Sequence, residues 1–438
     1  MKVHHLSLLT AAASLLSGHA AEIQQPALGH LQHLSVAPEN QRVDLKPPSF
    51  THPTKITHPL YPVKSVVQTI LLGHVDGHAL QVIYTLLPKT KTVTWEGQDI
   101  ETVAVQYVAH LDRRIEEVAL DWYAQADDGS VWYFGEKVSN YKDGEVEDTD
   151  GTWLAGKDGP PAMIMPAAPK VGDVYRVENI PGVAFEEVRV KAVNVTVQGP
   201  LGPRPGAMIG SELHMEGTYS DKTFVPGYGE FVSTTAHELE AVALAVPTDS
   251  LAEPVPAELS AIRQGALAIF DLAASQQWDA ASARLQDMRT GWEAMCARGG
   301  VSTLLAAQMD RALRALEGDA LAPAVSGKVT EGARNGAIEV MLSALDLELR
   351  YRTPVAVDRD RFAVWARKAL VDAATREQGF VLSDIVSLEL ISDRIEHTLG
   401  AALASADALL KELRVAARTE DYAKVSETAA KLLATEGK

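Results

Sequence analysis

Apolar residues recur at two different periods along this chain, and the change falls near Pro254. From about residue 62 to residue 246 they tend to alternate with polar ones, in segments rich in Val, Ile, Tyr and Trp, as is typical of β-strands. No pattern of helix length interrupts this region, so it predicts an antiparallel β sandwich or barrel. The expected strands are Ser65–Leu72, Ala79–Leu87, Lys91–Trp95, Glu101–Ala109, Arg114–Ala126, Ser130–Val138, Phe185–Val197 and Leu239–Val246.

Turn signals separate these segments. Pairs of an acidic residue and Gly favour tight hairpin turns, because Gly accepts the positive φ that such turns need. They stand at Asp76-Gly77, Glu96-Gly97, Asp128-Gly129 and Asp143-Gly144, and a Gly/Pro cluster at residues 199–206 predicts a further turn.

After Pro254-Val255-Pro256 the pattern becomes helical. Ala, Leu, Arg, Glu and Gln dominate, and apolar residues recur at a spacing of three to four. Short breaks between the segments favour antiparallel neighbours in a helical bundle. The expected helices are residues 257–275, 278–298, 301–317, 326–350, 358–377, 381–415 and 420–435, with a further candidate break at Gly400.

The chain as a whole is therefore predicted to be an α+β protein with four segments. Residues 1–20 have the form of a secretory signal peptide, with an apolar run from Leu6 to Leu16 and small residues before a cleavage site near Ala20. Residues 21–61 form a His- and Pro-rich arm, residues 62–250 the β domain and residues 257–438 the helical bundle. We expect a periplasmic or secreted protein with no transmembrane segment in the mature chain.

The amino-acid composition limits the classes of partner that the protein can bind. The formal net charge of −18 argues against nucleic acid and anionic membrane surfaces, since both bind basic proteins. The single cysteine, Cys296, excludes an intrachain disulfide.

One stretch of the β region resembles a known group of proteins. Asp121–Glu136 reads DWYAQADDGSVWYFGE, and it is followed by Gly151–Gly159, Ala162–Pro169 and Val171–Tyr175. These segments resemble a β domain of bacterial exported proteins of unknown function, with a D-W-Y-A-Q-D…G-N-V-W-Y-F-G-E core. Ala126 departs from that pattern, which usually has Asp. The resemblance implies a fold and export but no reaction.

Motifs of common enzymes are absent from the sequence. It contains no G-x-S-x-G elbow, no phosphate-binding loop and no G-x-G-x-x-G after a strand. His237-Glu238 begins like a zinc-protease helix, but Ala241 stands where the second His is needed. We therefore assign no catalytic residue and favour a protein that is not an enzyme.

Histidines gather in the arm and the first predicted hairpin. Neutral imidazoles bind divalent transition metals such as copper and zinc. The candidate metal ligands are His30, His33, His52, His58, His74 and His78. The alternative is a solvated His-rich linker.

Two other clusters are candidate binding sites. The acidic turn around residues 143–151 offers the oxygen ligands that calcium prefers, from Glu145, Asp148 and Asp150, or it is a solvated hairpin. Trp122, Trp132 and Trp153 form either an aromatic shelf for a ligand or plain cross-strand packing.

These observations favour an exported, non-catalytic protein that binds a divalent transition metal or another small ligand. One alternative is a structural subunit of a periplasmic or extracellular assembly, with a protein partner bound through the helical domain. A second alternative is a carboxylate-dependent hydrolase acting on carbohydrate over a cleft lined by those tryptophans.

Overall fold

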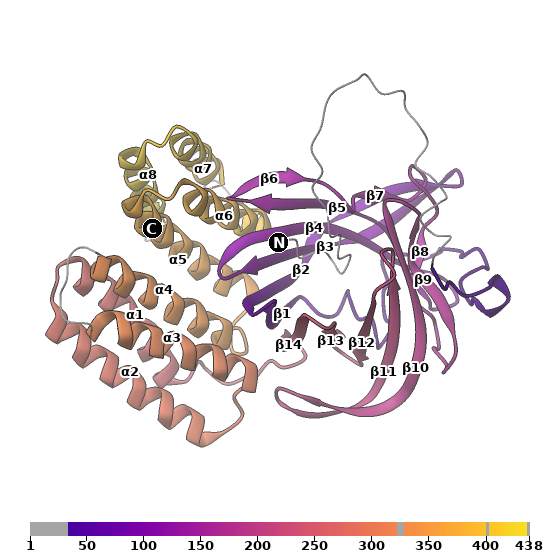
Figure 1. Ribbon diagram of the computed structural model, residues 1–438, viewed down its shortest axis with the longest axis horizontal. Coiled ribbons are helices and arrows are strands. Elements are labelled where there is room, and N and C mark those ends of the chain that lie inside the picture. Colours follow the sequence, from indigo (N-terminus) through magenta and orange to yellow (C-terminus); the bar gives the residue numbers. More distant parts are fainter. Residues whose placement is uncertain (1–33, 322–327, 400–402, 436–438) are drawn as a thin grey trace. The chain divides into compact units, whose positions relative to one another are not determined.

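The chain forms a β unit and a helical unit (Figure 1). The structure is a computed structural model that describes residues 34–321, 328–399 and 403–435. The β unit holds the described residues up to Tyr141, then Val146–Gly199 and Pro203–Val242. The helical unit holds Lys142–Glu145, Pro200–Gly202 and the described residues from Ala243 onward. An antiparallel β domain followed by helices is the fold class that the sequence predicts, and that prediction is confirmed.

One sheet of 14 strands makes up the β region. Its main path runs in the order β6-β5-β4-β3-β2-β1-β14-β13-β12-β11-β10-β9, and both β7 and β8 pair with β5. Figure 1 shows that the sheet is strongly curved. The strands are β1 Gln68–Val75, β2 His78–Trp95, β3 Gln98–Leu111, β4 Arg114–Gln125, β5 Val131–Lys142, β6 Glu145–Asp148, β7 Trp153–Leu154, β8 Ala162–Met165, β9 Val174–Ile180, β10 Ala184–Gly199, β11 Gly202–His214, β12 Tyr219–Val225, β13 Gly229–Thr234 and β14 Glu238–Val246.

Acidic-Gly pairs turn the chain between successive strands. At Asp76-Gly77, Glu96-Gly97 and Asp143-Gly144 both residues have positive φ, which matches the twist of a two-residue hairpin. The predicted turn at residues 199–206 is wrong in extent: only Pro200 and Leu201 turn, and β11 already begins at Gly202. Seven strands lie outside those expected from the sequence, namely β6, β7, β8, β9, β11, β12 and β13.

The strand register places polar and aromatic side chains together on one face. Directly opposite residues in an antiparallel pair share a face of the sheet. Asp121 lies opposite Glu136, and Tyr123 is paired with Tyr133. Tyr84 is paired with Tyr107 between β2 and β3. This face therefore combines tyrosine rings with carboxyl groups.

The described part of the arm packs on the β unit. The Ala37 N–H donates to Glu187 at 2.7 Å, and the Val43 N–H donates to the Val174 carbonyl. Near the end of the arm, Ile56, His58 and Leu60 are buried.

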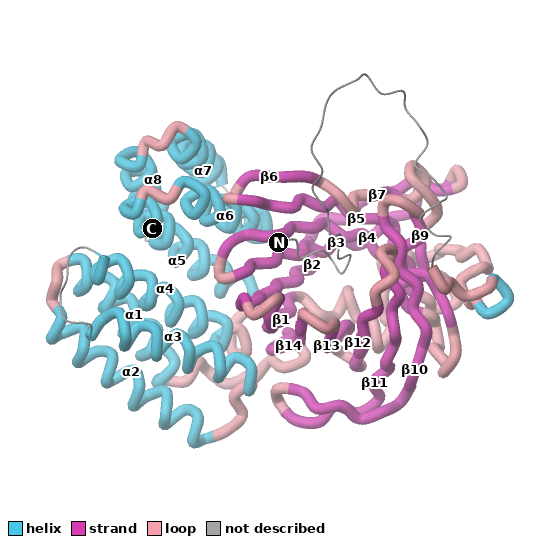
Figure 2. Tube along the Cα trace, in the orientation of Figure 1, coloured by secondary structure: helices cyan, strands magenta, loops and turns pink. Residues whose placement is uncertain are grey.

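Within the described residues, eight helices follow the sheet (Figure 2). The segment expected at residues 381–415 contains two described helices, α6 and α7, and the candidate break at Gly400 lies outside the described residues. In α5, Thr353 caps the first turn by accepting a hydrogen bond from the Ala356 N–H. Pro354 occupies the first helical position, where a missing N–H is tolerated. The helices are α1 Ala257–Ala274, α2 Trp278–Arg298, α3 Thr303–Leu321, α4 Lys328–Glu348, α5 Pro354–Thr375, α6 Gln378–Leu399, α7 Leu403–Arg418 and α8 Tyr422–Thr435.

Over the described ranges, none of these helices has the length and apolar character needed to cross a membrane.

Charged groups inside the helical unit are paired. Arg361 of α5 donates to Asp346 at 2.7 Å and to Asp358 at 3.0 Å, and all three side chains are buried. Arg394 of α6 donates to the same Asp358 at 2.8 Å. Burial raises the pKa of Asp358, but Arg394 and Arg361 outweigh burial and hold that pKa below its usual value.

Candidate functional site

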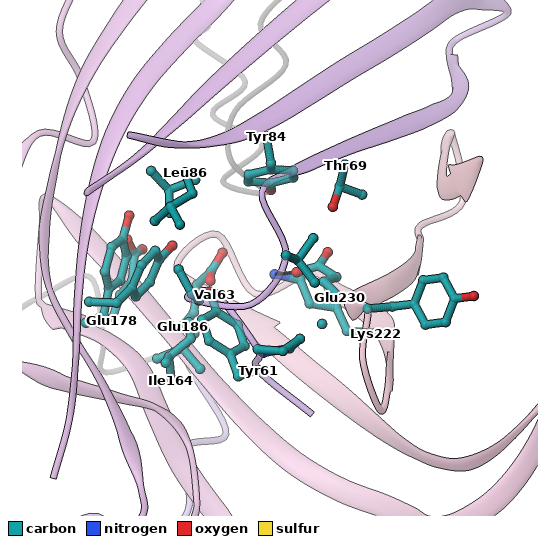
Figure 3. Close-up of a pocket in the computed structure, with 18 residues that line it drawn as sticks. Tyr61, Val63, Thr69, Tyr84, Leu86, Ile164, Glu178, Glu186, Lys222 and Glu230 are labelled. Atoms are coloured by element: carbon teal, nitrogen blue, oxygen red, sulfur yellow. Dashed lines mark ion pairs between the residues drawn. The ribbon is translucent and has the colours of Figure 1, made fainter. Parts of the chain in front are cut away.

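A cavity opens inside the β unit (Figure 3). About 120 Å³ of its interior can hold the centre of a water molecule. One part of its wall is apolar, from Val63, Val66, Leu86, Val105 and Ile164. Most of the remaining wall is made of aromatic and charged side chains from β2, β4, β5, β9, β10, β12 and β13, from the turn before β13 and from the chain before β1.

Tyrosine rings form much of this wall. Five line the cavity: Tyr61, Tyr84, Tyr123, Tyr133 and Tyr228. Tyr123 and Tyr133 stack with their ring centroids 4.8 Å apart, and Tyr61 meets Tyr123 edge-on at 5.3 Å. Burial raises the pKa of Tyr61 and of both stacked tyrosines, so these phenols stay neutral.

Carboxyl groups stand beside the tyrosines. Glu178, Glu186 and Glu230 line the cavity, and Figure 3 labels all three. The Tyr133 hydroxyl donates to Asp121 at 2.9 Å. Burial, followed by the charges of Glu178 and Asp121, raises the pKa of Glu136 well above its usual value. The interior of the β unit therefore concentrates acid groups that oppose one another's ionisation.

Two carboxylates and one imidazole converge at Glu186, Glu212 and His214. One ligand atom from each lies within 4.8 Å of the others, and all three residues are buried. In the part of the chain that the structure describes, this is the one group of three or more His, Cys, Asp or Glu side chains that meets this spacing. Glu186 also lines the cavity, so the cluster adjoins it.

Hydrogen bonds connect the three ligands in a chain. His214 Nδ1 lies 3.1 Å from Glu186 Oε1, and His214 Nε2 lies 2.9 Å from the Ser220 hydroxyl. The Ser220 hydroxyl in turn donates to Glu212 Oε2 at 3.5 Å, so its oxygen accepts from the Nε2–H of His214. Nδ1 then faces the Glu186 carboxyl, with one proton between them.

The electrostatics of the cluster agree with that shared proton. Burial raises the pKa of Glu186 to about 8, and the charge of Glu212 adds to this effect. Burial lowers the pKa of His214, but its hydrogen bond to Glu186 and the two carboxylate charges outweigh burial and raise the net value. The Glu186–His214 pair therefore retains a proton at neutral pH.

Lys222 partly balances the acids. Its Nζ lies 2.7 Å from Glu212 Oε2 and 3.8 Å from Glu230. Burial lowers the pKa of Lys222, but the charges of Glu212, Glu230 and Glu186 outweigh burial. The net pKa therefore lies well above its usual value, and this lysine stays charged. Among the described residues, Glu212 Oε1 is buried and has no hydrogen-bond partner.

Among the described residues, no three of the predicted histidine ligands converge. His30 and His33 lie outside the described residues. His52, His74 and His78 are exposed, and His78 Nδ1 lies 2.6 Å from Asp112. His58 is buried, with its Nδ1 accepting from the Leu60 N–H and its Nε2 facing the Ala167 carbonyl at 3.3 Å. Both ring nitrogens of His58 are therefore engaged by backbone groups.

The acidic side chains proposed as calcium ligands contact other groups of the protein. Glu145 pairs with Arg418 within the helical unit, at 2.7 Å. Asp148 accepts hydrogen bonds from the Asn140 amide at 2.6 Å and from the Asp150 N–H at 3.1 Å.

The tryptophans proposed as a ligand shelf are buried. Trp122, Trp132 and Trp153 belong to the hydrophobic core, and the aromatic side chains at the cavity are tyrosines. Trp153 Nε1 donates to Glu178 at 3.2 Å, so this tryptophan supports a lining residue from behind.

Sequence reasoning missed Glu186, Glu212, His214 and Lys222. The available signal was the polar alternation Glu212-Leu213-His214, which places two ligand-type side chains on one face of a strand. That signal was hidden because the polar residues interrupt the apolar alternation by which strands are recognised.

Comparison of the sequence with protein-family models and with curated proteins gave no significant match.

Proposed function

We propose that this protein is an exported, non-catalytic binding protein that holds a divalent transition metal, zinc or copper, at Glu186, Glu212 and His214. The observation that carries the proposal is the convergence of three buried ligand atoms within 4.8 Å, one of them from a carboxylate with a buried oxygen that lacks a hydrogen-bond partner. An imidazole with carboxylates is a donor set that suits zinc and copper.

The surroundings of the cluster favour a cation. Glu186, Glu212 and Glu230 surround a single ammonium group, that of Lys222, which contacts Glu212 through Oε2 and leaves Oε1 for a ligand. A dication at the cluster would replace the proton between Glu186 and His214 and neutralise charge that burial makes costly.

Ser220 supports a metal-binding role for His214. A metal-bound imidazole usually donates its other ring N–H to a neighbouring oxygen, which fixes the orientation of the ring. Nε2 of His214 faces the Ser220 hydroxyl in this manner, so Nδ1 is the nitrogen available to a metal.

The structure offers less support for the two alternative functions, an assembly subunit and a hydrolase. The assembly hypothesis called for an apolar stripe on one helix, but on the described helices the exposed large apolar side chains are Phe380 of α6 and Val415 of α7. The hydrolase hypothesis called for a cleft lined by tryptophans, whereas tyrosines line the cavity.

Competition titration with a zinc chelator tests the proposal on the full-length chain after removal of metal with EDTA. We expect one tightly bound zinc per chain and a loss of affinity of at least roughly 100-fold in His214→Ala and in Glu212→Gln. The matched control is His237→Ala, since His237 is exposed and outside the cluster.

A second variant separates the two histidine hypotheses. If His52→Ala/His58→Ala removes the metal while His214→Ala keeps it, the site lies in the arm and the proposal is wrong. If wild-type protein binds no zinc or copper in stoichiometric amount, metal binding itself is refuted.

A further inference from the structure

We propose that the tyrosine-lined cavity of the β unit binds an amphipathic organic cation, a protonated amine joined to an apolar body. This inference goes beyond the metal cluster, because among the cavity residues that carry it only Glu186 belongs to that cluster.

The charge of the wall selects the sign of the ligand. Three carboxyl groups line the cavity, from Glu178, Glu186 and Glu230. Lys222 is the one basic residue among the described residues that line it, and its ammonium is 2.7 Å from Glu212 but 3.8 Å from Glu230. Because the wall carries three carboxyl groups and one ammonium group, an anionic ligand would meet an excess of acid groups, whereas a ligand ammonium would gain charge-assisted hydrogen bonds from them.

The aromatic wall favours the same class. The face of a tyrosine ring attracts a cation, and the attraction strengthens where water is excluded. Tyr61, Tyr123 and Tyr133 form a contiguous set, with neighbouring centroids 4.8 and 5.3 Å apart. Their neutral phenols can also accept a hydrogen bond from an ammonium group.

The apolar part of the wall favours a ligand with an apolar body over a small inorganic ion. Val63, Val66, Leu86, Val105 and Ile164 line the cavity, and Figure 3 shows Val63, Leu86 and Ile164 around the same space as Glu178, Glu186 and Glu230. A site with mainly apolar walls and a few convergent polar groups is typical of small-molecule binding. The body of the ligand would displace water from these side chains.

Isothermal titration calorimetry with three probes of similar shape tests this inference. The probes are phenethylamine, 2-phenylethanol and 3-phenylpropionate, titrated into the full-length, EDTA-treated protein. We expect the amine to bind at least tenfold more tightly than the alcohol, and the carboxylate to bind most weakly.

The Glu230→Gln variant tests whether Glu230 is responsible for the preference for the amine probe. It should weaken phenethylamine binding roughly tenfold while leaving the alcohol unchanged, because only the charge of the side chain is lost. Glu178→Gln provides a second variant if the first fails to fold, and Glu216→Gln, on an exposed turn, is the matched control. Equal affinity for the three probes, stronger binding of the carboxylate, or no amine binding would overturn the inference.

The same protein separates this inference from the metal proposal. His214→Ala should lose zinc and keep phenethylamine binding, since His214 does not line the cavity. Loss of the amine preference in Glu230→Gln, with zinc binding intact, places the two ligands on different side chains.

Discussion

The two units treat buried charge in opposite ways. In the helical unit, the buried Asp346 and Asp358 each accept hydrogen bonds from a buried arginine, and Arg394 adds a second partner to Asp358. In the β unit, Glu186 and Glu212 lie with His214 around a single lysine, Lys222. Paired charges are explained by the fold alone. A surplus of buried acidic groups instead points to a bound cation, because burying like charges together costs free energy.

The largest effect should come from breaking the paired network. Arg361→Met removes the arginine that donates to Asp346 and one of the arginines that donate to Asp358. We expect the free energy of unfolding to fall by about 3–5 kcal/mol, as for other buried ion pairs that lose one member. Urea denaturation followed by circular dichroism at the helix band measures it.

An exposed ion pair provides the control for that prediction. Lys424 pairs with Glu412 and Glu427 on the surface, so Lys424→Met should leave the urea midpoint unchanged. If both variants shift the midpoint equally, burial is not what makes the network important.

A metal should act on the β unit alone. With free zinc at 100 times its dissociation constant, we expect about 2.7 kcal/mol of stabilisation. Hydrogen–deuterium exchange should show slower exchange in peptides from β10, β11 and β12, whereas helical peptides serve as the internal control. Equal protection of both units would mean that zinc does not bind at the cluster.

The two units should also respond to pH with opposite signs. Burial raises the pKa of Glu238 to about 7, although Lys222 lowers it in part. A carboxyl whose folded pKa is raised contributes stability below its unfolded pKa of about 4.5 and loses it as pH rises through 7. The depressed pKa of Asp358 has the reverse consequence: its contribution is present above its unfolded pKa and is lost as pH falls through the folded value.

The Glu238→Gln variant tests the predicted pH dependence of the stability of the β unit. The variant should become more stable than wild type by roughly 3 kcal/mol at pH 8.5, and the advantage should vanish near pH 4.5. Urea unfolding of the metal-free proteins at four pH values measures it, with the exposed Glu216→Gln as the control. An advantage that is the same at every pH would contradict the assigned pKa.

The smallest effect concerns the orientation of His214. Ser220→Ala removes the oxygen that holds Nε2 but no metal ligand. We expect zinc affinity to fall about tenfold, less than in His214→Ala. An affinity equal to that of wild type would mean that the Ser220 hydrogen bond does not position the imidazole.

The same contrast explains how far the sequence predicts this molecule. The helical unit follows its pattern closely, because an amphipathic stripe and breaks such as Thr353-Pro354 are local signals. The first strands are also recognised, because their apolar alternation is regular. β11, β12 and β13 are missed, and these strands carry Glu212, His214, Lys222 and Glu230. Polar residues that face the interior of the sheet remove the periodic signal where the site lies.

The candidate ligands show a second limit. The histidines of the arm attract notice because they are close in sequence, yet the cluster joins Glu186 of β10 to Glu212 and His214 of β11, residues up to 28 positions apart. Their convergence depends on the pairing of two strands, which no local pattern reports.

X-ray absorption spectroscopy of the full-length protein loaded with one equivalent of zinc tests the central claim most directly. The buried cluster predicts a single imidazole nitrogen at about 2.0–2.1 Å, with oxygen atoms completing the coordination. It also predicts that His52→Ala/His58→Ala leaves the spectrum unchanged. A spectrum with two or more imidazoles, or one altered by that double substitution, would place the metal on the arm and contradict the account.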